Sequence, residues 1–336
     1  MRPSLVILTT HFGTNFSGGS TATCEIFSRI EEDFSKINVI ANELGEHPFK
    51  NINWLRYRTV PEAIKHIRSL DTESNIFYGD FYNAFLFTFL NKPFYFTYHD
   101  NWPELKLLGW QYRIQNRYYW TLYRRIFKRA KHVITVSNLK RRQVAHYSEH
   151  VSLIRNGFNQ PTISHRTESR KNVIMAGNID ARKYHQAIRL FDTLPADPEF
   201  EIHIYGHSRD KKLSRKLSTY SFVILKGFQS TIPYAEYSLL LHTSQMENLS
   251  IVWCEALYQR TKVLTFDVGA AREVIDGESG WCIPPYDISN MRTRLLNHIR
   301  HPTAITETPA SLQQYNWQNA SEQYKSLLFR ERAVDA

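Results

Sequence analysis

Residues 5–20 read LVILTTHFGTNFSGGS, an apolar segment that runs into a turn with paired glycines. The segment Leu5–Thr9 is rich in aliphatic residues and is typical of a buried strand. This apolar run is far too short for a membrane span or a secretory signal, and turn residues follow it directly. Gly18 and Gly19 then open a helical pattern over residues 20–33, so the chain begins as a strand–turn–helix unit.

Apolar strands and helical patterns alternate through both halves of the chain. In residues 1–158 the other expected strands are Ile37–Ala41, Ile76–Tyr78, Phe94–Tyr98, Val133–Ser137 and Val151–Ile154, and the expected helices are Pro61–Leu70, Phe81–Leu90, Leu105–Arg129 and Leu139–Tyr147. In the second half the expected strands are Val173–Ala176, Glu201–Tyr205, Val223–Leu225, Leu239–His242 and Val263–Phe266, and the expected helices are Arg182–Asp192, Asp210–Thr219, Ile251–Gln259 and Ile288–Ile299. Continuously apolar strands between helices indicate parallel sheets that are covered on both faces.

A polar stretch with a proline, NQPTISHRTESRK at residues 159–171, separates the two runs and is the predicted linker. A chain of 336 residues is also too long for one ordinary core. The sequence therefore predicts an α/β protein with two Rossmann-like doubly wound parallel-sheet domains, residues 1–158 and 172–310, that face a cleft. The segment 311–336 is predicted to hold a helix that packs back across this cleft.

Composition and charge narrow the class of protein. The 42% of hydrophobic and 14% of aromatic residues favour a packed globular protein over a disordered one. Three widely spaced cysteines without a CxxC motif favour a reducing cytosol and predict no zinc site. The net charge of +10 is uneven, because residues 1–158 hold 21 Lys and Arg against 13 Asp and Glu while the remainder is close to neutral. We therefore expect different partners for the two halves.

Polar residues follow several of the predicted strands, at the edge where doubly wound sheets bind ligands. Gly18 and Gly19 let the backbone approach an anionic ligand at a helix N-terminus, or else they form a plain turn. His99 follows the strand Phe94–Tyr98 and either belongs to a site or is bonded to its neighbour Asp100.

Arg182 and Lys183 come shortly after Asn178, at the start of a predicted helix. Two cations at that place are suited to neutralise a diphosphate. The alternative is that both side chains are simply solvated.

The stretch QMENLSIVWCEAL, residues 245–257, places two carboxylates eight positions apart. Glu247 projects from a loop, whereas Glu255 lies in a helix among apolar residues, where an unpaired carboxylate is costly. Both side chains are placed to face one ligand, with the loop's amides and the helix N-terminus between them. Because a carboxylate accepts hydrogen bonds from a pair of hydroxyls, a sugar or ribose diol is a natural partner. The alternative is that Glu255 pairs with a core arginine or lysine.

In their order and spacing, these segments resemble the GT-B glycosyltransferases of glycosyltransferase family 4 over most of the chain. The resemblance rests on the paired glycines, the Glu-x7-Glu pair and six further segments: YHD at 98–100, VITVSN at 133–138, IRNGF at 154–158, AGNIDARK at 176–183, FDVGAAREVI at 266–275 and GWCIPP at 280–285. It implies a retaining, nucleotide-sugar-dependent glycosyltransferase, with the donor in the C-terminal domain and the acceptor on the N-terminal one.

The resemblance also implies roles for individual residues. Glu247 would contact the hydroxyls of the transferred sugar, Glu255 the ribose diol and Lys183 the diphosphate. Gly19 would approach the diphosphate from across the cleft, and His99 would lie beside the reacting sugar. The expected donor-binding set is completed by Gly18, Asn178, Arg182, Asn248, Leu249, Ser250 and Ile251.

The chain departs from the family at two places in this set. Asn178 stands where the family usually has an arginine, and Asn248-Leu249-Ser250 follows Glu247 where the family has EGFG. By the resemblance, the donor's own phosphate oxygen takes the acceptor's proton in a front-face attack. No DxD motif is present, so no metal and no other cofactor is expected beyond the donor itself, for which a UDP-sugar is favoured over a GDP-sugar.

The segment 105–148 predicts where the protein works, because it holds eleven basic side chains and no acidic one. Six of them fall within roughly 60° of a helix circumference, flanked by Trp110 and Trp120: Lys106, Arg113, Arg117, Arg124, Lys128 and Lys131. Such a stripe is typical of a helix that binds an anionic membrane surface, the alternative being a solvated face. We therefore expect a cytoplasmic protein, peripheral on the inner face of the cell membrane, that acts in bacterial surface polysaccharide or lipopolysaccharide biosynthesis.

Two other classes of function stay open. One is a non-catalytic basic protein that binds a membrane or nucleic acid, although no RNA-binding or zinc-finger signature supports nucleic acid as a partner. The other is a GT-B epimerase or phosphorylase, although no lysine has the flanking pattern expected for pyridoxal phosphate. Binding of a labelled nucleotide sugar, followed by detection of free or transferred sugar, separates these classes.

Overall fold

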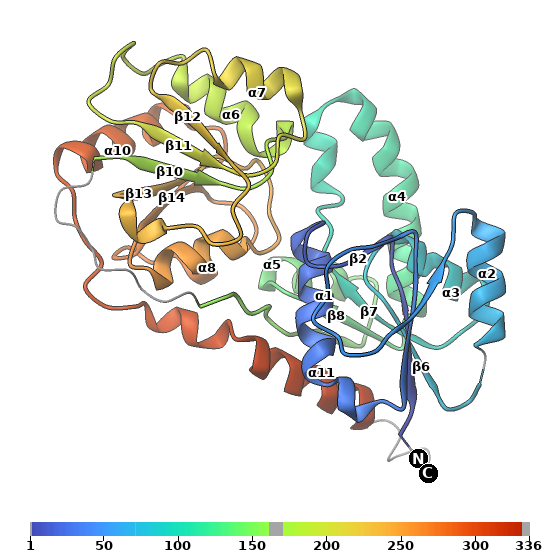
Figure 1. Cartoon of the computed structure of the whole chain (residues 1–336). Coiled ribbons are helices and arrows are strands. Elements are labelled where there is room, and N and C mark those ends of the chain that lie inside the picture. The colour runs from blue at the N-terminus through green and yellow to red at the C-terminus, as the bar shows by residue number, and fades with distance from the viewer. Residues whose placement is uncertain (1, 71, 161–170, 331–336) are drawn as a thin grey trace. The chain divides into compact units, whose positions relative to one another are not determined.

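The computed structural model describes residues 2–70, 72–160 and 171–330, which form two α/β units (Figure 1). Unit 1 comprises the chain up to Gly157 together with the chain from Gln314 onward, and unit 2 is Phe158–Gln313. Most of the predicted linker, residues 159–171, lies outside the described residues, as does the end of the segment 311–336.

Unit 1 is built on a seven-stranded parallel sheet with the order β5-β3-β1-β6-β7-β8-β9. Its strands are β1 (Ser4–Leu8), β3 (Lys36–Ala41), β5 (Asn53–Arg56), β6 (Asn75–Gly79), β7 (Phe94–Tyr98), β8 (His132–Thr135) and β9 (Val151–Leu153), and a short parallel pair is formed by β2 (His11–Phe12) and β4 (Glu43–Leu44). Because β1 pairs with β3 on one side and β6 on the other, the chain winds away from β1 in both directions.

Helices cover both faces of this sheet. On one face, α2 (Val60–Ser69), α3 (Phe85–Phe89), α4 (Trp110–Arg129) and α5 (Asn138–Ala145) share a core with alternate strand residues such as Val6 and Phe96. On the other face, α1 (Gly18–Arg29) packs beside α11 (Trp317–Arg330), where Phe27 contacts Tyr78 and Tyr324 (Figure 1). The C-terminal helix thus completes the core of unit 1.

Unit 2 repeats this plan with a six-stranded parallel sheet in the order β12-β11-β10-β13-β14-β15. The strands are β10 (Val173–Ala176), β11 (Ile202–Tyr205), β12 (Val223–Gly227), β13 (Leu239–His242), β14 (Lys262–Phe266) and β15 (Gly280–Ile283). The helices are α6 (Ala181–Phe191), α7 (Lys211–Leu217), α8 (Ile251–Tyr258), α9 (Ala271–Val274) and α10 (Ile288–Arg300). The winding direction changes between β10 and β13, so the loops after these two strands meet at the switch point.

The predicted fold class is confirmed, and the differences concern single elements. The expected helix Leu105–Arg129 is two elements, the 3-10 helix η3 (Glu104–Leu108) and α4, because Gly109 has a φ of 145°. The expected helix Phe81–Leu90 divides in the same way into η2 (Tyr82–Ala84) and α3. Strands β5 and β15 were not predicted. Three further 3-10 helices are η1 (Glu31–Asp33), η4 (Tyr234–Glu236) and η5 (Ala310–Gln314).

Candidate functional site

The loops after β10 and β13 are tied together at the carboxyl edge of the unit 2 sheet. Asp180 caps α6, since its Oδ1 accepts a hydrogen bond from Lys183 N at 3.0 Å. Gln245 N donates to the carbonyl of Arg182 at 3.0 Å, and Thr243 Oγ1 donates to the carbonyl of Lys183 at 2.6 Å. The first turn of α6 is therefore fixed against the loop that carries Glu247.

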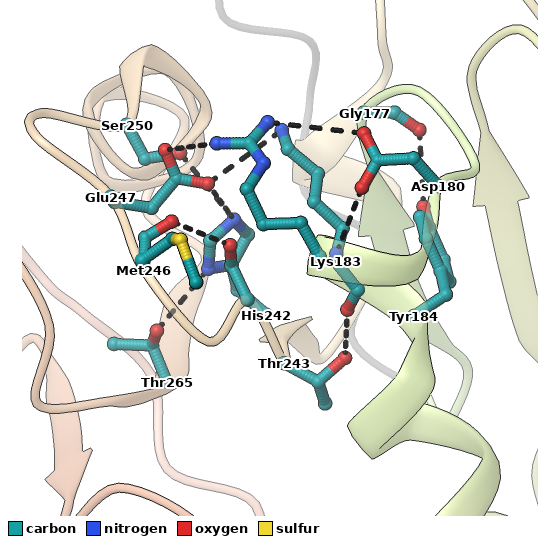
Figure 2. Close-up of polar contacts among 12 residues, drawn as sticks. Gly177, Asp180, Lys183, Tyr184, His242, Thr243, Met246, Glu247, Ser250 and Thr265 are labelled. Carbon is teal, nitrogen blue, oxygen red and sulfur yellow. Dashed lines mark hydrogen bonds and ion pairs between the residues drawn. The ribbon is translucent and has the colours of Figure 1, made fainter. Parts of the chain in front are cut away.

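Glu247 is buried among three basic groups (Figure 2), its side chain being 8% exposed. Its Oε2 lies 3.4 Å from Arg182 Nη1, and its Oε1 lies 3.9 Å from Lys183 Nζ and 3.6 Å from His242 Nε2. Burial alone would raise the pKa of Glu247, but Arg182, Lys183 and His242 outweigh it and lower this pKa to about 2. The carboxylate is thus ionised throughout the neutral range.

Lys183 lies over the backbone that follows β10. Gly177 has a φ of 127°, which favours glycine over residues with a side chain, and a Cβ added there would lie 2.5 Å from Lys183 Nζ. Burial lowers the pKa of Lys183, and Glu247 opposes this shift. Asn178 follows Gly177 and is partly exposed. Two cations in the first turn of a helix form an arrangement that suits a diphosphate.

Glu255 has no basic partner among the described residues. It lies on α8, partly buried, and its Oε2 accepts a hydrogen bond from the Tyr234 hydroxyl at 3.0 Å. Burial raises the pKa of Glu255 to about 7, while the Tyr234 hydroxyl acts in the opposite direction. The alternative of a core ion pair is therefore not what the structure shows, and the carboxylate keeps capacity to accept hydrogen bonds from a ligand.

The segment between the two carboxylates lies in the same loop and helix start. Asn248 and Ser250 are buried, and Leu249 and Ile251 are partly buried. Ser250 occupies the N-cap position of α8, but its side chain makes no capping hydrogen bond. Its hydroxyl instead lies 3.5 Å from His242 Nε2.

The candidate residues of unit 1 meet at the carboxyl edge of its own sheet. Gly18 and Gly19 form the start of α1, where Ser17 Oγ accepts a hydrogen bond from Ser20 N. A Cβ added at Gly19 would lie 3.0 Å from His99 Cβ, so the two residues are in close contact. Burial lowers the pKa of His99 to about 4, and its Nε2 has no hydrogen-bond partner within the described chain.

The neighbour of His99 has a different partner, since the Asp100 carboxylate accepts a hydrogen bond from the Tyr123 hydroxyl. An acid that the sequence did not single out lies nearby along the sheet edge. Asp80 directly follows β6, accepts a hydrogen bond from Thr23 Oγ1 at 2.7 Å, and has a pKa that burial raises to about 7.

The basic stripe of the long helix is shorter than predicted. Arg113, Arg117, Arg124 and Lys128 are exposed on α4, but Lys106 lies on η3 and Lys131 follows the end of α4. Trp120 does not edge the stripe, because it packs edge-to-face against Phe127 and Tyr147. Trp110 is exposed as predicted, at 69%, and it begins a row of exposed apolar side chains, spaced four residues apart, that continues with Ile114 and Tyr118, each 62% exposed.

Two further statements apply to the described ranges as a whole. No helix there is both long enough and apolar enough to cross a bilayer. No three His, Cys, Asp or Glu side chains of this part of the chain come together as a metal-binding group.

The structure thus brings the predicted residues together in two places. Glu247, Arg182 and Lys183 are in mutual contact in unit 2, with Asn178 beside them, and Gly19 and His99 are in contact in unit 1. The sequence did not single out His242 and Tyr234, which contact the two carboxylates. For His242 there is one signal in the sequence, a polar residue that ends an otherwise apolar strand.

Comparison with protein families gives two matches that follow each other along the chain. The family described as Glycosyltransferase Family 4 matches residues 23–160, and the family described as Glycosyl transferases group 1 matches residues 159–317. No curated protein has a significantly similar sequence.

Solved structures show the same fold at low sequence identity. HepE of Anabaena, in complex with UDP and glucose, is 16% identical with a TM-score of 0.76, over 97% of this chain and 99% of that chain. Sucrose-phosphate synthase from Thermosynechococcus elongatus is 13% identical with a TM-score of 0.77, over 100% of both chains. WaaG, a glycosyltransferase involved in lipopolysaccharide biosynthesis, is 17% identical with a TM-score of 0.70, over 98% of both chains. At these identities the likeness shows the fold alone.

Proposed function

The chain belongs to the GT-B glycosyltransferases of the family 4 type, and from this premise we propose that it transfers a sugar from a nucleotide-sugar donor with retention of the anomeric configuration. One observation carries the proposal: the buried Glu247 is held between Arg182 and Lys183 at the switch point of the unit 2 sheet. An anion site beside a carboxylate that accepts sugar hydroxyls fits a sugar joined to a diphosphate.

In the proposed complex, each side chain has one task. The donor's diphosphate binds Arg182 and Lys183, which releases Glu247 from its ion pairs to accept hydrogen bonds from the sugar. Glu255, held by Tyr234 and free of cations, accepts hydrogen bonds from the ribose hydroxyls. Asn178, Leu249 and the start of α8 supply neutral groups around these charges.

The reaction breaks the bond between the sugar's anomeric carbon and the diphosphate oxygen and joins that carbon to the acceptor's oxygen. The acceptor's proton passes to the leaving diphosphate, which departs with the bonding electron pair. Arg182 and Lys183 stabilise the charge that develops on this leaving group, the kind of contribution that is usually largest in catalysis. His99 is proposed to lie beside the reacting sugar and, being neutral, to donate or accept a hydrogen bond without adding charge.

The donor that we propose is a UDP-sugar. HepE binds UDP and glucose and shares the fold, which favours a UDP-sugar over a GDP-sugar. The sequence lacks a DxD motif, so we propose that the reaction requires no divalent metal and no other cofactor. As acceptor we propose a saccharide or lipid-linked saccharide of a bacterial surface polysaccharide or lipopolysaccharide, a class supported by the fold shared with WaaG.

A panel of UDP-, GDP-, ADP- and dTDP-sugars, first by thermal shift and then by turnover of labelled donor, tests the donor site. Glu255→Gln should mainly weaken donor binding and Glu247→Gln should mainly lower turnover, each by about 1.5–3 kcal/mol for a lost charged hydrogen bond. The matched control is Glu236→Gln, an exposed carboxylate on η4. The proposed function is wrong if no nucleotide sugar shifts the melting temperature. It is also wrong if the control loses as much donor affinity and turnover as the two variants.

We also propose that α4 binds an anionic membrane surface. Four of its six exposed cations (Arg113, Arg117, Arg124, Lys128) lie beside the exposed row Trp110, Ile114 and Tyr118, a combination of charge and apolar area that favours the lipid interface. Each cation near such a surface contributes about 1 kcal/mol. The protein would then work in the cytoplasm at the inner face of the membrane.

Co-sedimentation with liposomes tests this second proposal. Binding should require anionic lipid and should fall as salt is added. It should also be lost when Arg113, Arg117 and Arg124 are changed to glutamate. The control changes Arg141 and Arg142, which are exposed on α5, to glutamate and should keep most of the binding. Equal binding to neutral and anionic vesicles, or an equal loss in both variants, would show that α4 is a solvated face. Competition by nucleic acid would favour the basic-protein alternative.

A further inference from the structure

His242 is the last residue of β13 and lies beside Glu247 (Figure 2). The three residues before it in the strand, Leu239–Leu241, are apolar and fully buried, and His242 itself is 3% exposed. Burying an imidazole here costs desolvation free energy that a fourth leucine would not cost, unless the ring nitrogens form hydrogen bonds with neighbouring groups. Its polar neighbours are Glu247, Ser250 and Thr265.

The polar neighbours of the ring favour one of its two neutral tautomers. Nδ1 lies 3.3 Å from Thr265 Oγ1, a hydroxyl that can donate to it. Nε2 lies 3.6 Å from Glu247 Oε1, a carboxylate oxygen that can only accept, and 3.5 Å from Ser250 Oγ, a hydroxyl that can donate or accept. Burial lowers the pKa of His242 to about 3, and the ring is therefore neutral near pH 7. Because the ionised Glu247 carboxylate can only accept, it favours the tautomer with the N–H on Nε2, in which Nδ1 accepts from the Thr265 hydroxyl.

Packing holds the ring in this orientation. His242 meets Trp253 of α8 edge to face, with ring centroids 5.2 Å apart and planes at 81°. Trp253 is fully buried, so the imidazole cannot swing away without opening the core.

Glu247 Oε1, by contrast, is a buried oxygen without a hydrogen-bond partner among the described residues. In the free protein its charge is balanced by Arg182 and Lys183. Once both cations bind a diphosphate, the same carboxylate would be left buried with its charge uncompensated on that side.

We propose that His242 is a positioning residue, which donates its Nε2–H to Glu247 and keeps this carboxylate aimed at the donor's sugar when Arg182 and Lys183 are occupied by the diphosphate. The inference rests on the proposed function, because it assigns Glu247 to the sugar. A neutral donor suits this task better than a third cation, since it orients the carboxylate without competing for the diphosphate. The inference predicts that loss of the His242 N–H weakens recognition of the donor's sugar and leaves binding of its nucleotide nearly unchanged.

The test compares His242→Leu, which removes the donor, with His242→Gln, whose amide can replace the N–H. His242→Leu should lower kcat roughly tenfold or more and should reduce the preference for UDP-sugar over UDP in binding, while the Kd for UDP changes less than about twofold. His242→Gln should restore part of kcat. The matched control is His298→Leu, a second buried histidine, on α10, whose Nε2 lies 3.1 Å from the carbonyl of Ser238.

A double-mutant cycle with Glu247→Gln completes the experiment. If His242 acts through Glu247, adding His242→Leu to Glu247→Gln should lower kcat little further. Two results would overturn the inference and leave the proposed function intact. One is that the losses of kcat from His242→Leu and Glu247→Gln are additive in the double variant. The other is that His242→Leu and the control His298→Leu lose kcat equally at equal melting temperature. If the wild-type protein binds no nucleotide sugar, the proposed function fails and this inference fails with it.

Discussion

Lowering the pH from 8 to 6 should weaken donor binding through one carboxyl group. Burial raises the pKa of Glu255 to about 7, and no cation among the described residues pairs with it. Glu247 and His242, which share the switch point of unit 2, keep their charge states in this interval, since the pKa of Glu247 is about 2 and that of His242 about 3. Asp80 of unit 1 also has a pKa of about 7, so the Glu255→Gln variant is needed to assign the effect. Between pH 8 and pH 6 the group of the proposed donor site that changes its charge is therefore the Glu255 carboxyl group.

The magnitude follows from the fraction of Glu255 that is ionised. Only the carboxylate accepts hydrogen bonds from both ribose hydroxyls, so the protonated form binds the donor weakly. With a pKa near 7, about nine-tenths of the side chains are ionised at pH 8 and about one-tenth at pH 6. The Kd for the donor should therefore rise about tenfold between pH 8 and pH 6.

Isothermal titration calorimetry with UDP-glucose is a suitable assay, because its diphosphate diester does not change charge in this range, whereas the terminal phosphate of UDP does. Glu255→Gln should bind the donor weakly and with little dependence on pH. A 2′-deoxyribose donor should lose most of the same dependence. A wild-type Kd that is constant from pH 6 to pH 8, or a Gln variant that keeps the tenfold change, would refute the assignment of Glu255 to the ribose.

The same carboxyl group gives the stability of the protein a pH dependence opposite to that of donor binding. Its pKa is raised from 4.5 to about 7 on folding, so the folded state binds more protons and stability falls as the pH rises through this window. Glu255→Gln should consequently stabilise the protein at pH 8, by up to about 3 kcal/mol. Tyr234→Phe should act in the other direction, because it removes the hydroxyl that favours the ionised form.

Three further predictions concern unit 1. His99→Ala should lower turnover at an unchanged melting temperature, because Nε2 makes no hydrogen bond within the described chain; unfolding of the variant would instead assign His99 a structural role. Gly19→Ala should also lower turnover, since its Cβ would lie 3.0 Å from His99 Cβ and displace that ring; kinetics equal to the wild type would contradict the contact. Glu104→Gln should lower the free energy of unfolding in urea by about 3–5 kcal/mol. The reason is that the Lys140 amine, which is 2.6 Å from Glu104 and whose side chain is 1% exposed, loses its counter-charge. An unchanged unfolding midpoint would show that other groups compensate the charge of Lys140.

Much of the fold was predictable because its central strands are apolar on both faces. Strands such as Phe94–Tyr98 are buried at every position, and continuous burial leaves a continuous apolar run in the sequence. β5 lacks this signal, since it is an edge strand whose residues are at most partly buried. The break at Gly109 was missed because amphipathic spacing continues across it, although one glycine changes the backbone direction.

The candidate site was predictable only where its chemistry is local in the sequence. The two carboxylates lie in one short stretch, and Arg182 and Lys183 are adjacent, so their types and spacing carry the information. The contacts of Tyr234 with Glu255, and of Arg182 with Glu247, span 21 and 65 positions and arise when separate strands and helices pack together. His242 is close to Glu247 in sequence, but only the structure shows that its ring faces the carboxylate.

The positive charge of the proposed donor site comes from a helix and not from the loop after β10. The loop carries the uncharged Asn178, whereas Arg182 and Lys183 stand in the first turn of α6, where the helix dipole adds to their charge. In the free protein these two cations are balanced by Glu247 and by Asp180, whose Oδ2 lies 3.9 Å from Arg182 Nη2. A diphosphate brings its own negative charge and competes with Glu247 for both cations. Filling the phosphate site therefore frees the carboxylate that we assign to the sugar, so that binding of the leaving group and orientation of the transferred sugar are coupled through one side chain.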